Sequence, residues 1–255
     1  LHYHGEDWLP QMINMLTDSE TPLPQIPFAP DFLSSLGMIP NEYLFYFYNR
    51  VQAVENILES GRTRGEQIAS LNEQLFSDLA KEISLSDPEK LLTVYFDYID
   101  NRGETYMSVE TGGLQDISKM NVDLAKTIIS GGYAGVALDL IEGLVGAHSM
   151  VMTLNIPNQF AINGMGPVDV VEIPAYVSRG RIQPCVVGDL PESCFGLIKQ
   201  VKTYEHLTIE AALNRSYLSA MQALVTHPLV MDYAKAKSIL DGYIVQHGDI
   251  FPQLR

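Results

Sequence analysis

The sequence predicts an α+β protein that is mostly helical, with a small central sheet. Two observations lead to this fold class. Apolar residues recur at helical spacing over most of the chain, and β-branched residues gather in two short runs near its middle. The chain has 255 residues, 46% of them hydrophobic, which is enough to bury a core in one large domain or two small ones.

The first 40 residues predict extended structure rather than helix. Residues 1–10 alternate like a strand, with a turn at Gly5 to Asp7 before Trp8 and Leu9 resume the pattern. Residues 17–40 contain five prolines, so a loop is expected there, broken only by the short apolar stretch 32–36.

Helices are expected from Asn41 onward. The apolar pattern predicts two consecutive helices over residues 41–80, interrupted at Gly61. Asp87, followed by a proline, predicts the start of a third helix that ends near Gly103. The remaining helices are expected at residues 122–129, 133–144, 197–213, 216–225 and 231–247.

Two strands are expected in the middle of the chain, at residues 150–156 and 168–177, linked by a loop. The first strand ends in "NIPN", which brings Asn155 and Asn158 to the point where the backbone leaves the sheet. Amide side chains both donate and accept hydrogen bonds, so they suit sugar hydroxyls. Asparagines in loops also satisfy backbone groups, and both readings stay open for these two residues.

Charge and motifs narrow the classes of function. The formal net charge is −15, so an anionic nucleic acid or membrane surface is not an expected partner. No apolar run approaches the roughly 20 residues that span a bilayer, and the two cysteines stand in no metal-binding spacing. No glycine-rich nucleotide loop is present. A reducing cytoplasm is the expected location.

Tyr133 is the best single candidate for chemistry. It follows Gly131-Gly132 and precedes an apolar helical run. A phenol has an ordinary pKa near 10, and a helix N-terminus favours its ionised form because unpaired N–H groups and the helix dipole attract negative charge. Arg102 is a candidate anion contact, although a basic residue near a helix end also fits the dipole there.

Eight segments, in this order, resemble the C-terminal part of glycoside hydrolase family 4. These enzymes are NAD- and metal-dependent glycosidases and include 6-phospho-β-glucosidases. Taken singly, the "VVEIP" strand, the "VKTYEHLTIEAA" helix and "HPLV" are moderate signals, and in this order they are a strong one. The eight segments are residues 26–50, 63–76, 131–141, 154–162, 169–177, 187–193, 196–213 and 223–230.

The resemblance implies a C-terminal domain over residues 1–255 with a fold like that of the lactate dehydrogenase C-terminal domain. It implies hydrolysis of β-glucosides, plain or 6-phosphorylated, by NAD-dependent oxidation at C3, deprotonation at C2 and elimination. The C2 base of the family is a tyrosine at a helix start, which matches Tyr133; Tyr106, after Arg102-Gly103, is its competitor. A divalent metal such as manganese, a sugar or sugar-phosphate substrate and a homo-oligomer, dimer or tetramer, are implied as well.

This sequence also departs from the family pattern at several points. The N-terminal Rossmann domain, the Cys-Asn-x-Pro metal motif and the metal-binding histidine after it have no counterpart here. We therefore assign no cofactor-binding or metal-binding residue, and we expect this chain alone to bind neither group tightly and to be inactive. Pro157 stands where phosphoglucosidases of the family often have arginine, which leaves phosphate recognition to another arginine such as Arg102 or Arg179.

Two other functions remain open at this point. The chain could be a non-catalytic module for oligomerisation or for covering the substrate, with chemistry supplied elsewhere. It could also be the C-terminal domain of a lactate/malate-type dehydrogenase, although the sequence shows no histidine–aspartate motif of that kind.

Overall fold

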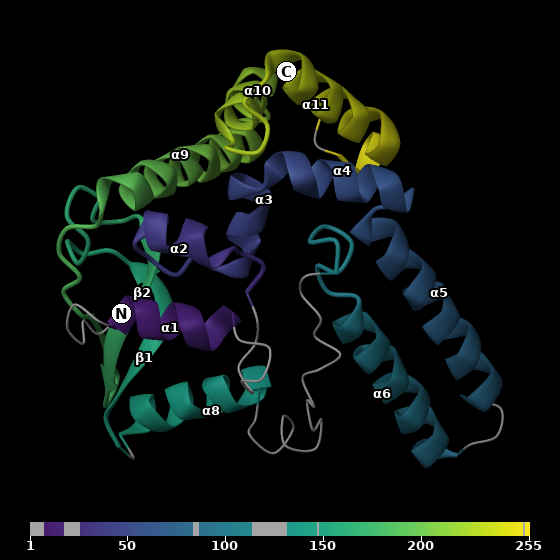
Figure 1. Ribbon diagram of the computed structural model, residues 1–255, viewed down its shortest axis with the longest axis horizontal. Helices are drawn as coiled ribbons and strands as arrows, with labels where there is room; N and C mark the ends of the chain where they lie inside the picture. Colours follow the sequence, from purple (N-terminus) through teal and green to yellow (C-terminus); the bar gives the residue numbers. More distant parts are fainter. Residues whose placement is uncertain (1–7, 18–25, 84–86, 114–131, 147, 252) are drawn as a thin grey trace. The chain divides into compact units, whose positions relative to one another are not determined.

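The computed structural model describes residues 8–17, 26–83, 87–113, 132–146, 148–251 and 253–255 (Figure 1). Its described part is mostly helical with one antiparallel sheet of three strands, as predicted. The chain divides into two compact units, Leu1–Val122 and Asp123–Arg255. None of the described helices has the length and apolar character needed to cross a membrane.

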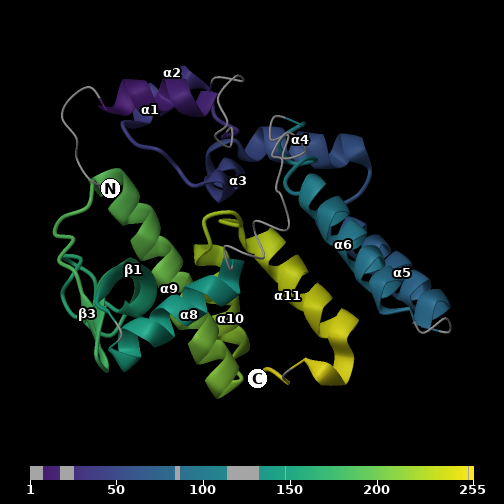
Figure 2. The same ribbon diagram turned by 90° about the horizontal axis from the view of Figure 1, so that it is seen from below.

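The N-terminal unit is built from helices alone in its described part. Its longest two, α5 and α6, run side by side as a hairpin (Figure 2). Asp87 begins α6 as predicted, because its Oδ1 accepts hydrogen bonds from the backbone N–H groups of Glu89 and Lys90. The elements are α1 (Trp8–Thr17), α2 (Pro30–Leu36), η1 (Glu42–Leu44), α3 (Phe45–Tyr48), α4 (Arg50–Ser60), α5 (Arg64–Ile83) and α6 (Pro88–Glu104).

Two expectations for the first 40 residues were wrong where the structure describes them. Residues 8–10 belong to helix α1, not to a strand, because Ile13 is buried and Leu9 packs beside it from one turn earlier. Residues 30–36 form helix α2, not a loop, because Pro30 occupies the first position, where a missing N–H costs nothing. Residues 1–7 and 18–25, which carry the rest of both expectations, lie outside the described residues.

The core of the N-terminal unit is aromatic. Leu33 of α2 and Phe45 of α3 are almost fully buried. Phe28, which precedes both in sequence, is also buried, and its ring centroid lies 6.0 Å from that of Phe45. Phe32 and Tyr48 extend the cluster, with ring centroids 5.1 Å apart. The tilted and edge-on geometry is the one that aromatic quadrupoles favour.

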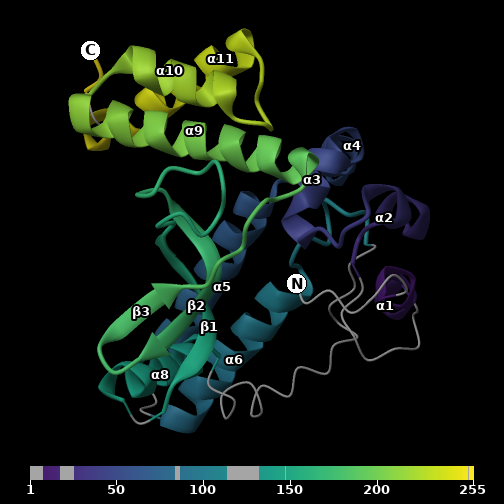
Figure 3. The same ribbon diagram turned by 90° about the vertical axis from the view of Figure 1, so that its left-hand side faces the viewer.

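The C-terminal unit combines the sheet with four longer helices (Figure 3). Helices α10 and α9 pack together, and α11 packs against α10 around the buried Leu240. Strand order is β1-β2-β3, with Asn155 opposite Glu172 and Tyr176 opposite Gln183. The elements are α8 (Gly132–Val145), β1 (Met150–Pro157), β2 (Val170–Ser178), β3 (Arg181–Pro184), α9 (Glu192–Asn214), α10 (Tyr217–Thr226), α11 (Tyr233–His247) and η3 (Gly248–Ile250).

Most predictions for this unit are confirmed, and one strand was missed. The predicted strands correspond to β1 and β2, and the last four predicted helices to α8, α9, α10 and α11. Strand β3 was not predicted because its four residues include Arg181 and Gln183 and give no alternating apolar pattern. The predicted helix at residues 122–129 lies outside the described residues.

Helix α8 packs on the buried face of β2 at a close approach. Gly143 of α8 lies against Val177, and a Cβ at position 143 would stand 2.8 Å from Val177 Cγ1. Gly196 is a matched contrast, because it also lies inside a helix, α9, and a Cβ there would meet nothing within 4 Å.

We therefore predict opposite effects for two glycine-to-alanine substitutions. Gly143→Ala should lower the free energy of unfolding, because overpacking costs about 1–3 kcal/mol and exceeds the helix gain. Gly196→Ala should raise it by about 0.5–1 kcal/mol, because alanine restricts the unfolded chain and favours helix. Urea titration of both variants measures this. Equal shifts would contradict the close packing of α8 on β2.

Candidate active site

Tyr133 stands where the sequence predicted, at the start of a helix. Helix α8 begins at Gly132, so Tyr133 is its second residue, and no acidic residue occurs in the first turn. The first four backbone N–H groups of a helix have no partner within it. A negative charge placed at this end is stabilised by those groups and by the dipole, with no carboxylate nearby in the turn to oppose it.

Asn155 lies on the outer face of the sheet. Side chains of β1 alternate between half-buried and exposed positions, and Asn155 is one of the exposed ones. It pairs across the sheet with Glu172, which is also exposed. Its amide is therefore open to a ligand approaching the outer face.

Asn158 satisfies backbone groups of the loop, which is the second of the two roles that the sequence left open. Its side chain is fully buried, with 0% of its surface exposed. Its Nδ2 donates to the carbonyl oxygens of Ile162 (3.1 Å) and Met165 (3.2 Å), and its Oδ1 accepts from Ile162 N–H at 2.8 Å. In this arrangement Asn158 organises the loop between β1 and β2 and leaves no surface for a sugar hydroxyl.

The same loop displays a phenylalanine on a strained backbone. Gln159 and Phe160 both have positive φ, 45° and 69°, in the left-handed region that L-residues rarely adopt. Phe160 is 73% exposed. Such strain persists only when surrounding contacts fix it, and here the three hydrogen bonds of Asn158 hold the neighbouring backbone.

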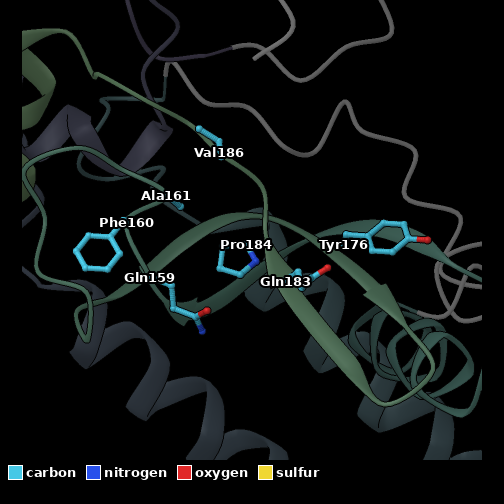
Figure 4. Close-up of a pocket in the computed structure, with 7 residues that line it drawn as sticks. All are labelled: Gln159, Phe160, Ala161, Tyr176, Gln183, Pro184 and Val186. Atoms are coloured by element: carbon cyan, nitrogen blue, oxygen red, sulfur yellow. The ribbon is translucent and has the colours of Figure 1, made fainter.

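Phe160 borders a hollow beside strand β3 (Figure 4). The hollow has a volume of about 420 Å³. Its polar groups come from Gln159, Tyr176 and Gln183, and its apolar surface includes Val186. Tyr176 shares the outer face of the sheet with Asn155, four residues from Glu172 along β2. Aromatic and amide groups together can bind a sugar-like ligand.

A histidine–aspartate contact was missed by sequence analysis. His206 Nε2 of α9 lies 3.1 Å from Asp169 Oδ1, and Asp169 Oδ2 accepts a hydrogen bond from Gly166 N–H at 2.9 Å. Lys202, one turn earlier on α9, donates to the carbonyl oxygen of Val170 at 2.7 Å. Because Asp169 is buried and anchors the loop, these contacts attach α9 to the β1–β2 loop.

Arg102 and Tyr106 belong to the N-terminal unit. Arg102 is exposed in the last turn of α6, and its Nη1 donates to the Tyr98 hydroxyl at 3.2 Å. That hydroxyl donates in turn to Asn72 Oδ1 at 2.6 Å. The other nitrogens of the Arg102 guanidinium form no ion pair with a carboxylate among the described residues.

Tyr106 is the weaker candidate for a base. Its ring packs edge-on against Tyr43, with centroids 6.0 Å apart. Burial raises the pKa of the Tyr106 phenol above its usual value, and a hydrogen bond with Tyr43 and the nearby Glu42 raise it further. A raised pKa leaves less phenolate at neutral pH, which weakens Tyr106 as a base.

Comparison with known proteins agrees with the resemblance seen in the sequence. Residues 1–230 match the model of the family 4 glycosyl hydrolase C-terminal domain. A probable 6-phospho-beta-glucosidase of Bacillus subtilis is 28% identical over 88% of this chain and 44% of its own length. A 6-phospho-beta-glucosidase of Thermotoga maritima is 26% identical over 93% of this chain and 48% of its own length.

Solved structures show the same fold. The Thermotoga maritima 6-phospho-beta glucosidase, determined with manganese, NAD+ and glucose-6-phosphate, superposes with a TM-score of 0.63 at 22% identity. The superposition covers 97% of this chain and 49% of that one. The chain thus spans about half the length of the curated relatives it matches. With 230 of its 255 residues matched by the domain model, the chain belongs to family 4 of the glycosyl hydrolases, as its C-terminal domain.

Proposed function

We propose that this chain is the substrate-side part of a glucosidase that hydrolyses 6-phosphorylated β-glucosides by oxidation at C3, deprotonation at C2 and elimination. Family membership and the names of the relatives support the reaction class. The observation that carries the assignment within this chain is the position of Tyr133, second residue of α8, at the helix end that stabilises a phenolate.

NAD and a metal are assigned to other parts of the intact enzyme. The residues that the structure describes include no group of three or more His, Cys, Asp and Glu side chains that could hold a metal ion. The sequence also lacks a glycine-rich nucleotide loop. When bound, NAD supplies the oxidation at C3 and a divalent ion such as manganese supplies positive charge at the substrate oxygens.

Tyr133 accepts the C2 proton in this proposal. Oxidation at C3 acidifies the proton on C2, and a tyrosine at the start of a helix, where negative charge is favoured, can act as the base that removes it. Removal of this proton drives loss of the aglycone from C1. Water then adds at C1, C2 regains a proton and the hydride returns to C3, so that the net reaction is hydrolysis. Asn155 is the proposed contact for sugar hydroxyls, through the amide that it exposes on the outer face of the sheet. Arg102, in the N-terminal unit, is the proposed contact for the 6-phosphate, a pairing that arginine geometry favours.

We also propose that the protein is a cytoplasmic homo-oligomer. Leu213, Leu218 and Val245 are large apolar side chains that are mostly exposed on the helices of the C-terminal unit. Exposed apolar surface of this kind is common at subunit contacts. The chain can have both an assembly role and a catalytic role. Substitution of Tyr133 distinguishes the two, because only the catalytic role predicts a loss of turnover.

We predict that Tyr133→Phe in the intact enzyme lowers turnover by about 100- to 10,000-fold, the usual range for loss of a general base. Exchange of the C2 proton with deuterium from solvent, followed by NMR, should disappear as well. The matched control is Tyr106→Phe, which removes the competing phenol and should leave exchange nearly unchanged. If Tyr106→Phe abolishes exchange and Tyr133→Phe does not, the assignment of the base is wrong.

We predict that Arg102→Ala in the intact enzyme raises KM for a 6-phosphorylated glucoside by about 10- to 100-fold, because a hydrogen bond to a charged group contributes about 1.5–3 kcal/mol. KM for the unphosphorylated glucoside should change little. Arg179→Ala is the parallel test of the other candidate arginine. If only Arg179→Ala raises KM for the phosphorylated glucoside, the phosphate contact is Arg179, in the β2–β3 turn, and not Arg102.

We predict that this polypeptide, prepared alone, does not hydrolyse nitrophenyl glucoside 6-phosphate even with added NAD and manganese, because the described residues provide no metal site. Release of nitrophenol measures this. Turnover clearly above the buffer blank would show that the chain carries the complete catalytic machinery.

A further inference from the structure

The N-terminal unit contains a cavity that the proposed reaction does not use. It has a volume of about 640 Å³, within the range of small-molecule sites. Part of its lining comes from α4 and the residue before it, and part from the segment around Phe28 together with Phe45. Gly112 closes one side.

Three amides form the α4 wall. Asn49, Gln52 and Asn56 are spaced by three and four residues, so they lie along one face of the helix. Gln52 Nε2 donates to Asn56 Oδ1 at 2.9 Å, and Asn56 Nδ2 donates to the carbonyl oxygen of Glu110 at 2.8 Å. This relay fixes the orientation of both amides and leaves the Oε1 of Gln52, a residue that lines the cavity, as an acceptor.

Asn49 has an unused capping position. It is the N-cap residue of α4, where an asparagine side chain usually accepts a hydrogen bond from the first turn. Here its side chain makes no capping bond. The first turn of α4 thus leaves the donor and acceptor groups of this amide available to a ligand in the cavity that Asn49 lines.

Gly112 keeps the relay in place. Its φ is +62°, and a Cβ at this position would stand 3.1 Å from Asn56 Nδ2. A side chain there would push against the amide that binds the Glu110 carbonyl oxygen. Because residue 112 has no side chain, the Asn56 amide can approach the backbone there closely. The amides of α4 are thus ordered before any ligand binds.

The lining has no charge. None of the described residues that line the cavity is acidic or basic, although the chain as a whole carries 47 charged side chains. An anion such as a phosphate would find no counter-charge there. A ring with hydroxyl groups on one side and an apolar face on the other matches a lining that combines amides with apolar side chains such as Leu16 and Ile26.

We propose that this cavity binds the uncharged ring of a glycoside, through the amides of Asn49 and Gln52, and takes no part in phosphate recognition. The inference rests on the proposed function for the choice of a glycoside. It adds a site in the N-terminal unit that is separate in its residues from Tyr133, Asn155 and Arg102.

The test is direct binding of phenyl β-glucoside to the intact protein, measured by calorimetry or ligand-observed NMR without turnover. Gln52→Leu and Asn49→Ala should each weaken binding about fivefold, as loss of one ordinary hydrogen bond implies. Gln74→Leu is the matched control, because Gln74 is an exposed amide on α5 that bonds to Asp78 and does not line the cavity. Thermal melting shows whether each variant is folded.

Two further measurements distinguish binding at this cavity from binding that depends on Tyr133 or on phosphate. Tyr133→Phe should bind phenyl β-glucoside as the wild type does, so failure of the proposed base and failure of this site are distinguishable. Inorganic phosphate should not displace the glucoside, whereas free glucose should compete if the sugar ring, and not the phenyl group, is held. Equal affinity in wild type, Gln52→Leu and Asn49→Ala, or displacement by phosphate, would overturn the proposal.

Discussion

The C-terminal unit depends on burial of one face of strand β2. Every second side chain of this strand, Val171, Ile173, Ala175 and Val177, is almost removed from water. Helix α8 packs on one end of that face, while Ile162 and Met165 of the β1–β2 loop and Phe195 of α9 pack on the other. Because side chains of a strand alternate, burying this face fixes which residues the outer face presents. The exposure of Asn155 and Tyr176 thus follows from the core beneath them.

The same core holds the β1–β2 loop, which borders the candidate site, in a fixed position. The β1–β2 loop cannot shift without disturbing Ile162, which is buried and also bonded to Asn158. Asp169, at the far end of the loop, is bonded both to Gly166 and to His206 of α9. A binding surface supported in this way costs little entropy to order when a ligand arrives.

The sequence predicted the parts of the fold that depend on local signals. The start of α6 was predictable from Asp87 and Pro88, and β1 and β2 from their β-branched runs. Helix α2 was missed because the many prolines around it outweighed the apolar spacing of Phe32, Leu33 and Leu36. Strand β3 was missed because pairing with β2, and not its own composition, makes it a strand.

Predicting the site depended on family resemblance more than on local physics. The helix start at Tyr133 was visible in the pattern, but the proposal that this residue is a base, and not a packing residue, rests on the resemblance. The buried role of Asn158 was one of two open readings, since burial depends on the tertiary fold. The His206–Asp169 contact joins residues 37 positions apart in sequence and could not be found without the structure.

Strand β1 lies at the edge of the described sheet, with β2 on one side only. Its sequence, "MVMTLNIP", has no charged residue, and such an edge can template the addition of a strand from another chain. Pro157 ends this strand, and a proline cannot donate the hydrogen bond that a growing ladder needs. Pro157 therefore limits the addition of a further strand at this end of β1, where a charged side chain would be the other common means.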